Sequence, residues 1–326
     1  MEIKHSGRIS QLFIYTGKLF RMFVLQNDWK MLPMAAIIAA IVSYVVGSTL
    51  FVNMAGTLMG TFGLTSICVW NGCFNSIQAI CRERPIVKRE HRSGLHMTSY
   101  IGAHMIYQAF ICLCQTGIII VVLHISNVSF PSLSHVTGSV DADLFITMFL
   151  ISYASDMISL FVSAIVRNTT TAMTVMPFVM IFQLIFSGGI FALSGFAHTL
   201  TDFAVSRWGL CAMCAISDYN SLPNEMILAT IDNIDVSKLS SDYSETDISG
   251  GAGITVADAA EILQEGMRDP ELREKFIYTC GEMAYVEDYR SDGDNIINCW
   301  LNIGTAIVIF PILSVAALEF IDKDKR

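Results

Sequence analysis

Residues 100–123 read YIGAHMIYQAFICLCQTGIIIVVL and contain no Asp, Glu, Lys or Arg. A helix rises about 1.5 Å per residue, so about 20 mainly apolar residues cross the roughly 30 Å hydrocarbon core of a bilayer. This stretch is therefore long and apolar enough to span a membrane. The preceding residues 81–92 are by contrast crowded with Arg, Lys and Glu, which is typical of a loop at the membrane surface.

The rest of the chain repeats this pattern of long apolar stretches. Hydrophobic residues make up 53% of the 326 residues and charged residues only 15%, whereas about a quarter of a soluble protein is charged. We therefore expect an all-α membrane protein with six transmembrane helices. The expected spans are residues 33–52, 58–80, 100–123, 144–166, 172–193 and 298–321.

The distribution of Lys and Arg predicts how these spans are oriented. With the N-terminus in the cytosol, 14 of the 20 Lys and Arg residues lie in cytosolic segments, and the short outer loops after spans one and three contain none. The remaining ones all lie in the long loop before the last span. We therefore expect an integral protein of the plasma or inner membrane with both termini in the cytosol.

This topology divides the chain into four segments. Residues 1–32 form a cytosolic N-terminus with an amphipathic helix, and residues 33–193 hold spans one to five with a cytosolic loop at 81–99. Residues 194–297 form a large extracytoplasmic segment. Residues 298–326 comprise span six and a basic cytosolic tail.

The extracytoplasmic segment combines an apolar start with an acidic remainder. Phe196–Ile216 is apolar but interrupted by polar residues, so we expect short re-entrant helices that are covered by protein. The later part predicts a helix at Thr255–Met267, which opens with a capping box, and another after Asp269, where Pro270 suits a first turn. This acidic domain is either a solvated cap, or a lid or docking surface for an extracellular partner.

The N-terminal helix is expected to be amphipathic and basic. Its apolar residues recur at helical spacing, which predicts a helix lying in the inner headgroup layer, although binding of a soluble partner helix would need the same pattern. Its position directly before a span favours the membrane surface. The apolar face comprises Ile9, Leu12, Phe13, Thr16, Phe20, Phe23 and Val24.

The cysteines and histidines predict neither a metal site nor a catalytic site. Cys211 and Cys214 have the spacing of a redox motif, but no strand–turn–helix pattern surrounds them. Cys280, expected on the same outer face, could pair with either of them in an oxidising compartment. No H-E-x-x-H sequence and no nucleophile–base pair occurs at membrane depth, so we expect no metal and no enzyme activity on this chain.

Residues 81–92 also predict a short helix outside the membrane. Pro85 suits the start of a helix and Gly94 suits its end. The residues between them carry too many charges to enter lipid, so this helix lies in water or docks against another protein. A simpler role, as a positively charged anchor on the cytosolic side, would require no partner.

Three features of the sequence resemble a known family. Residues 81–90, CRERPIVKRE, resemble the charged loop between spans two and three of type-2 ABC exporters of the subfamily-G kind, the White and pleiotropic-drug-resistance proteins. Residues 177–189, PFVMIFQLIFSGG, resemble the fifth span of those proteins. The layout is also similar: an N-terminal elbow helix, six spans, and a large helical extracytoplasmic loop before the last span.

The resemblance implies that the charged helix couples ATP hydrolysis to the spans. The sequence has no G-x-x-x-x-G-K-[ST] motif, so we expect ATP and Mg²⁺ to bind a separate ABC ATP-binding subunit, and no cofactor to bind this chain. Six spans are half of the family's usual number, which implies a second transmembrane half in a homodimer or a heterodimer. The expected coupling residues are Glu83, Arg84, Lys88, Arg89 and Glu90.

The resemblance also places a substrate cavity between spans two and five of both halves. Residues 70–74, WNGCF, resemble its substrate-facing turn, and an exit valve is expected near Gly189, where the family often has a bulky residue. Side chains of these types also commonly face lipid or simply pack. The expected cavity residues are Asn71, Phe74, Ile181, Leu184 and Ile190.

Polar residues inside spans are costly, and they tend to face a bundle interior or a cavity. Asp156 is the one acidic residue in the middle of an expected span, and Asn71 and Gln108 are expected at a similar depth. We expect these three side chains to form an intramembrane hydrogen-bonded cluster. The cluster either holds helices together, or contacts substrate or relays protons.

These features together predict the transmembrane subunit of an ATP-driven exporter. It would move an amphipathic substrate (a lipid, peptide or drug) outward by alternating access, and it would have no nucleic-acid partner. The alternative is a non-transporting receptor, immunity or channel-like membrane protein that uses its extracytoplasmic domain for binding.

Overall fold

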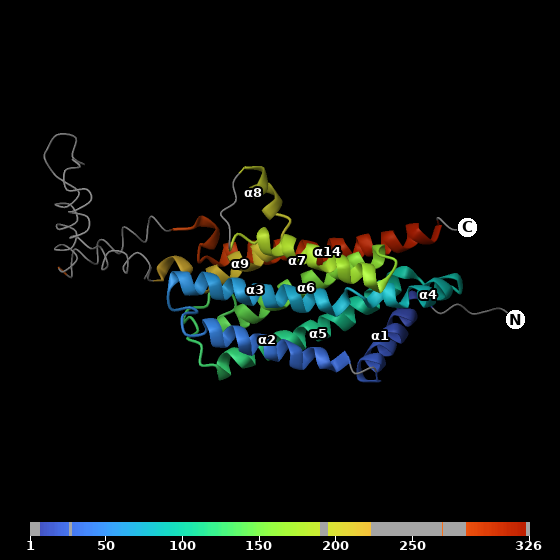
Figure 1. The fold of residues 1–326 in the computed structure, drawn as a ribbon, viewed down its shortest axis with the longest axis horizontal. Helices are drawn as coiled ribbons and strands as arrows, with labels where there is room; N and C mark the ends of the chain where they lie inside the picture. Colours follow the sequence, from blue (N-terminus) through green and yellow to red (C-terminus); the bar gives the residue numbers. More distant parts are fainter. Residues whose placement is uncertain (1–6, 26–27, 190–194, 223–268, 270–284, 324–326) are drawn as a thin grey trace.

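The computed structural model describes residues 7–25, 28–189, 195–222, 269 and 285–323, and this part is helical, with no strand among those residues (Figure 1). Short 3-10 turns occupy Asp28–Lys30, Tyr219–Ser221 and Glu287–Tyr289. The α-helices are α1 (Arg8–Leu25), α2 (Met31–Val46), α3 (Met54–Ser76), α4 (Ala79–Arg92), α5 (Met97–Ile125), α6 (Val140–Ile165), α7 (Thr169–Ile185), α8 (Phe196–Thr201), α9 (Val205–Ile216) and α14 (Gly293–Lys323).

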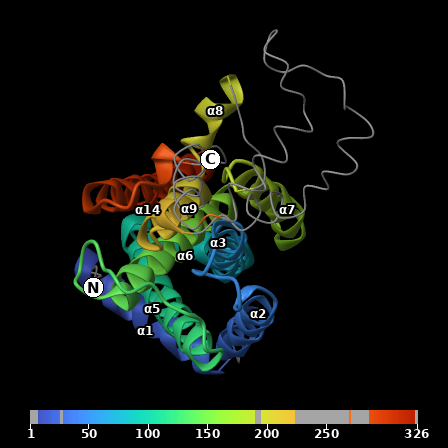
Figure 2. The same ribbon diagram turned by 90° about the vertical axis from the view of Figure 1, so that its left-hand side faces the viewer.

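Helix α6 is the centre of the bundle. Viewed along the long axis of the molecule, it lies among α3, α5, α9 and α14 (Figure 2). It packs most extensively against α3 and α14, and its apolar residues Leu144, Met148 and Ile151 are fully buried. Helices α5 and α9 also pack against α6, whereas α1 and α2 pack against α5, so much of the core follows the length of α6.

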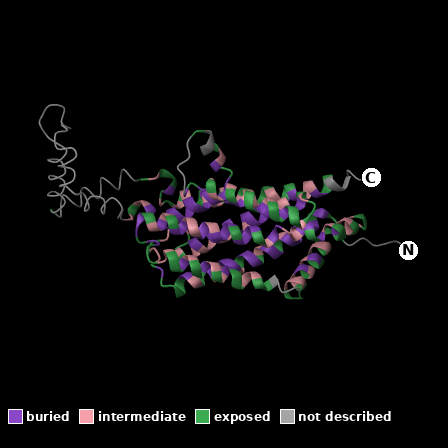
Figure 3. Ribbon diagram, viewed as in Figure 1, coloured by how far each residue is buried: buried purple, intermediate pink, exposed green. Residues whose placement is uncertain are grey.

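Three helices are long and apolar enough to cross a bilayer: α5, α6 and α14. Helices α2, α7 and α9 are apolar but shorter, and α2, with 16 residues, is only about 24 Å long. The exposed residues on the outside of the bundle are often large and apolar, for example Ile37, Tyr44, Phe178 and Leu301 (Figure 3). Such an apolar exterior suits lipid rather than water.

Several expected span boundaries are corrected by the structure. The first span was expected to reach residue 52, but α2 ends at Val46 and turns follow it. The second was expected to continue to residue 80, but α3 ends at Ser76 and α4 begins at Ala79. The fifth was expected to reach residue 193, whereas α7 ends at Ile185. Hydropathy does not detect these breaks because the turns are short, contain no charged residue and are flanked by apolar residues.

Helix α1 lies at the same end of the bundle as α4 and packs against α5 (Figure 1). The rings of Tyr15 and Tyr100 meet edge to face at 5.5 Å, and Phe20 lies 5.6 Å from Tyr107. The Gln11 amide donates to the Gly94 carbonyl and accepts from the backbone of residue 96. Part of the expected apolar face therefore packs on protein, while other apolar residues of α1 stay exposed: Ile9, Phe13, Ile14, Val24 and Leu25.

At the opposite end, α8 and α9 occupy the stretch expected to form short re-entrant helices. Arg207 of α9 is buried and binds Asp202, and it also donates to Asp288 at 3.1 Å. This ion-pair network joins α9 to the connection that leads into α14. The expected helices at residues 255–267 and after Asp269, together with Cys280, lie outside the described residues.

Candidate functional site

The charged segment forms α4, a helix with one buried and one exposed face. Ile80, Glu83 and Val87 are buried against the bundle. The helix ends at Arg92, and Gly94 follows with a φ of 105°, a left-handed conformation that terminates helices. The expected end at Gly94 is therefore confirmed. We define the exposed face of α4 as Arg82, Pro85, Ile86, Arg89 and Arg92.

The start of α4 is corrected by the structure, because Pro85 lies inside the helix and not at its first turn. The N-cap residue Gln78 makes no capping bond with its own side chain. Instead, Ser163 of α6 accepts hydrogen bonds from the backbone N–H groups of Ile80 and Cys81 at 3.0 and 3.1 Å. These are first-turn donors that have no partner within the helix. A residue of α6 therefore caps α4.

A second connection joins α4 to the end of α6. The Arg84 guanidinium donates to the carbonyl oxygens of Ala164 and Val166, at 2.6 and 2.8 Å. Those carbonyls belong to the last turn of α6, where no helical partner is left for them. Together with the Ser163 cap, this connection fixes α4 to the central helix at two successive turns, so a displacement of α4 would be transmitted directly to α6.

The five expected coupling residues take different positions. Glu83 is only 7% exposed and pairs with Lys18 of α1 at 3.7 Å, and Arg84 binds α6, so both of these side chains contact this chain rather than facing outward. Lys88 and Glu90 are half-buried. Arg89 alone of the five lies on the exposed face of α4. Burial raises the pKa of the Glu90 carboxyl above its ordinary value.

The expected cluster of Asn71, Gln108 and Asp156 has a different composition in the structure. No hydrogen bond joins the three side chains to one another. Gln108 donates to the backbone carbonyl of Asn75 at 3.3 Å, and the Asp156 carboxyl accepts a long 3.6 Å contact from the Cys112 thiol. All three residues are buried, as expected, but their side chains contact other partners.

The pair that does form joins α3 to α5. The Asn75 amide donates to the Gln115 oxygen at 2.8 Å, and the Gln115 amide donates back to Asn75 at 3.1 Å. Each side-chain amide thus donates one hydrogen bond to the other and accepts one from it. Both are polar residues inside expected spans, but depth in the membrane selected Asn71 for the expected cluster, because depth does not tell on which face of a helix a side chain lies.

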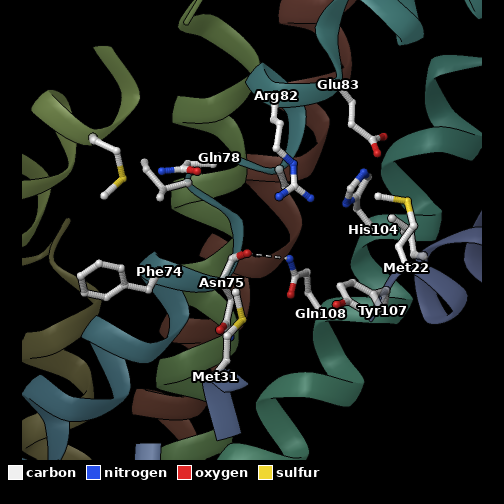
Figure 4. Close-up of a pocket in the computed structure, with 14 residues that line it drawn as sticks. Met22, Met31, Phe74, Asn75, Gln78, Arg82, Glu83, His104, Tyr107 and Gln108 are labelled. Carbon is white, nitrogen blue, oxygen red and sulfur yellow. Dashed lines mark hydrogen bonds between the residues drawn. The ribbon is translucent and has the colours of Figure 1, made fainter. Parts of the chain in front are cut away.

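A cavity of about 210 Å³ lies next to this pair, at the α4 end of the bundle (Figure 4). Its walls come from α1, α3, α5, the start of α4 and single residues of α2 and α7. Figure 4 shows Arg82 and Glu83 reaching in from α4, and Phe74 on the opposite side from His104 and Tyr107. Of the expected site residues, the cavity brings together Phe74, Gln108 and Glu83.

Two of the five expected substrate-cavity residues are exposed on the outside of the bundle. Phe74 of α3 is 46% exposed, and Ile181 of α7 is also exposed, whereas Leu184 is half-buried. Asn71 is buried, and its amide nitrogen has no hydrogen-bond partner among the described residues. Ile190 lies outside those residues. Helices α3 and α7 therefore share an exposed apolar surface, which we call the α3–α7 surface.

Comparison with known proteins adds to this geometry. The ABC-2 type transporter family matches residues 11–213, more than half of the chain, from α1 into α9. The ABC transporter ATP-binding/permease protein Rv1747 of Mycobacterium tuberculosis (strain ATCC 25618 / H37Rv) is 26% identical over 152 residues. That alignment covers 46% of this chain and 18% of the relative, so the chain spans only a small part of that protein's length.

Proposed function

Because the chain belongs to the ABC-2 type transporter family, we propose that it is the transmembrane subunit of an ATP-driven exporter of the subfamily-G kind. In this proposal an ATP-binding subunit outside these 326 residues binds ATP and Mg²⁺. The chain contributes six spans with both termini in the cytosol, and a second transmembrane half completes the pathway. The substrate is amphipathic and moves outward by alternating access.

The observation that carries the proposal is the double attachment of α4. This helix presents a basic, partly apolar exposed face, while Ser163 and Arg84 bind its other side to α6. A helix that only anchored the protein by its positive charge would not need such a connection to the central helix. The arrangement suits a part that receives a push from a partner and transmits it to the bundle.

The α3–α7 surface supports the proposal that a second transmembrane half packs against this chain. Phe178 and Ile181 of α7 and Phe74 of α3 expose apolar area that this single chain leaves uncovered. A second copy or a homologous half placed there would enclose a cavity with apolar walls, which suits an amphipathic substrate. The alternative is that lipid covers this surface. Cross-linking between cysteines introduced at residue 181 of two copies distinguishes these arrangements, because a cross-link forms only where the two copies meet.

The decisive experiment identifies the partner and tests the exposed face of α4. The tagged chain is purified from its native membrane, and copurifying proteins are identified by mass spectrometry. We expect an ATP-hydrolysing subunit that is retained by the unaltered chain and lost with Arg89→Glu. Arg21→Glu, which reverses an exposed charge on α1, is the matched control and should retain the subunit. A chain that never copurifies with a nucleotide hydrolase would contradict the proposal.

A further inference from the structure

The cavity at the α4 end is lined by a buried histidine that has no hydrogen-bond partner in the described part of the chain. His104 of α5 is 2% exposed, and neither of its ring nitrogens has a hydrogen-bond partner among the described residues. Its ring lines the cavity and packs edge-on against Tyr100 at 4.7 Å. Leaving a buried polar group unsatisfied costs free energy, so a polar atom of a ligand or of water belongs beside this imidazole.

The size and walls of the cavity favour an amphiphile over water alone. A volume of about 210 Å³ corresponds to about seven water molecules. Much of the lining is apolar, and Met22, Met31 and Met173 contribute flexible thioether side chains that adapt to different ligand shapes. Met173 and Phe74 are also exposed, so they connect the cavity to the outer surface of the bundle. The polar residues His104 and Gln108 are buried, whereas these two apolar residues lie at the rim.

The charges of the cavity favour a phosphate group. Arg82 lines it, and a guanidinium binds phosphate oxygens with two parallel hydrogen bonds. Glu83, the acid in the lining, has Lys18 at 3.7 Å, so its negative charge is balanced by a neighbour from α1. The side-chain amides of Gln78 and Gln108 add neutral hydrogen-bonding groups to the same wall.

We propose that this cavity binds the phosphodiester headgroup of a membrane lipid. Arg82 and His104 hold the headgroup, and an acyl chain leaves past Phe74 and Met173 into the bilayer. The site lies within one half of the transporter and beside the helix expected to receive the push of the ATPase. In the proposed topology α4 lies on the cytosolic side, so the lipid belongs to the cytosolic leaflet; this assignment rests on the proposed function, whereas the binding itself does not.

The test uses the purified full chain in detergent, without nucleotide or partner. Binding of dioctanoylphosphatidylglycerol is measured by isothermal titration, beside glycerol phosphate as a headgroup without chains and dioctanoylglycerol as chains without phosphate. We expect saturable binding of the lipid and much weaker binding of both fragments. Arg82→Gln should weaken lipid binding about tenfold, which corresponds to losing one charge-assisted contact.

Two further variants make the result specific. Arg21→Gln removes an exposed charge from α1 outside the cavity and should leave binding unchanged. Met173→Trp fills the rim from an exposed position and should also weaken binding, which keeps the test valid if Arg82→Gln does not fold. Equal binding of glycerol phosphate and the lipid would overturn the lipid as the ligand. Equal binding of dioctanoylglycerol, or no saturable binding, would overturn the headgroup site, while the proposed export function would stand.

Discussion

Gly72 of α3 lies directly against the backbone of Ser152 of α6. A methyl group at residue 72 would overlap the Ser152 carbonyl oxygen and lie 2.9 Å from the backbone nitrogen of Asp156. The two helices can approach this closely only because residue 72 has no side chain. Small residues at such crossings are a common device of membrane helices, since they allow close packing where the hydrophobic effect between helices is absent.

Gly72→Ala should therefore destabilise the protein, because backbone atoms cannot move aside as a flexible side chain does. We expect a loss of about 2–3 kcal/mol, measured as a lower midpoint of thermal unfolding in detergent. Gly304→Ala is the matched control. Gly304 of α14 has no atom within 4 Å of an added methyl group among the described residues, so its replacement should be neutral or slightly stabilising.

Ser163→Ala should loosen α4 without changing its sequence. The backbone N–H groups of Ile80 and Cys81 would lose their acceptor, at a cost of about 1–3 kcal/mol. Hydrogen exchange of the amides at the start of α4 should accelerate. Ser159→Ala, one turn earlier, removes a hydroxyl that has no partner among the described residues and should leave exchange unchanged. Equal exchange in both variants would show that Ser163 does not cap α4.

The stability difference between Glu90→Gln and the unaltered chain should depend on pH. Burial raises the pKa of its carboxyl above the ordinary 4.5, so folding favours the protonated form, and ionisation at higher pH destabilises the folded state. Glu90→Gln should therefore unfold at a higher temperature than the unaltered chain at pH 7. The difference should shrink as the pH falls and vanish below 4.5, where the carboxyl is protonated in both states. A difference independent of pH would refute this explanation.

Asp156→Asn separates the two roles that the sequence left open for this residue. Asp156 is fully buried, and one carboxyl oxygen has no hydrogen-bond partner among the described residues. Asparagine has the same shape, so we expect unchanged thermal unfolding and retained transport, as for a packing role. Lost transport at unchanged stability would instead support a proton relay.

Asp143, in the first turn of the same helix, provides the contrast. Its carboxylate accepts from the Ser134 hydroxyl at 2.7 Å and from the backbone of Thr137 at 3.0 Å, and so holds the connection before α6. Asp143→Asn should lower the unfolding temperature because charge-assisted acceptors are lost, at about 1.5–3 kcal/mol. If Asp143→Asn and Asp156→Asn changed the unfolding temperature equally, these hydrogen bonds of Asp143 would not explain the effect, and burial alone would.

The class of this protein follows from its sequence. Apolar stretches such as residues 100–123, now within α5, predict membrane helices because hydropathy is a local property. The charged segment before it predicts a helix outside the bilayer for the same reason, and its end at Gly94 was identified from one residue type. The family resemblance rests on the order of these local features, and the match to residues 11–213 supports its broader part, the ABC-2 type transporter family.

The hydrogen-bond partners of the polar side chains become known from the tertiary structure alone. Asn71 and Asn75 lie one turn apart on α3, about 6 Å along its axis, yet it is Asn75 that pairs with Gln115. Ser163 caps a helix that begins in a different part of the chain. Such partners depend on the rotation and relative shift of neighbouring helices, which are set by close contacts such as that of Gly72 and not by the composition of either helix.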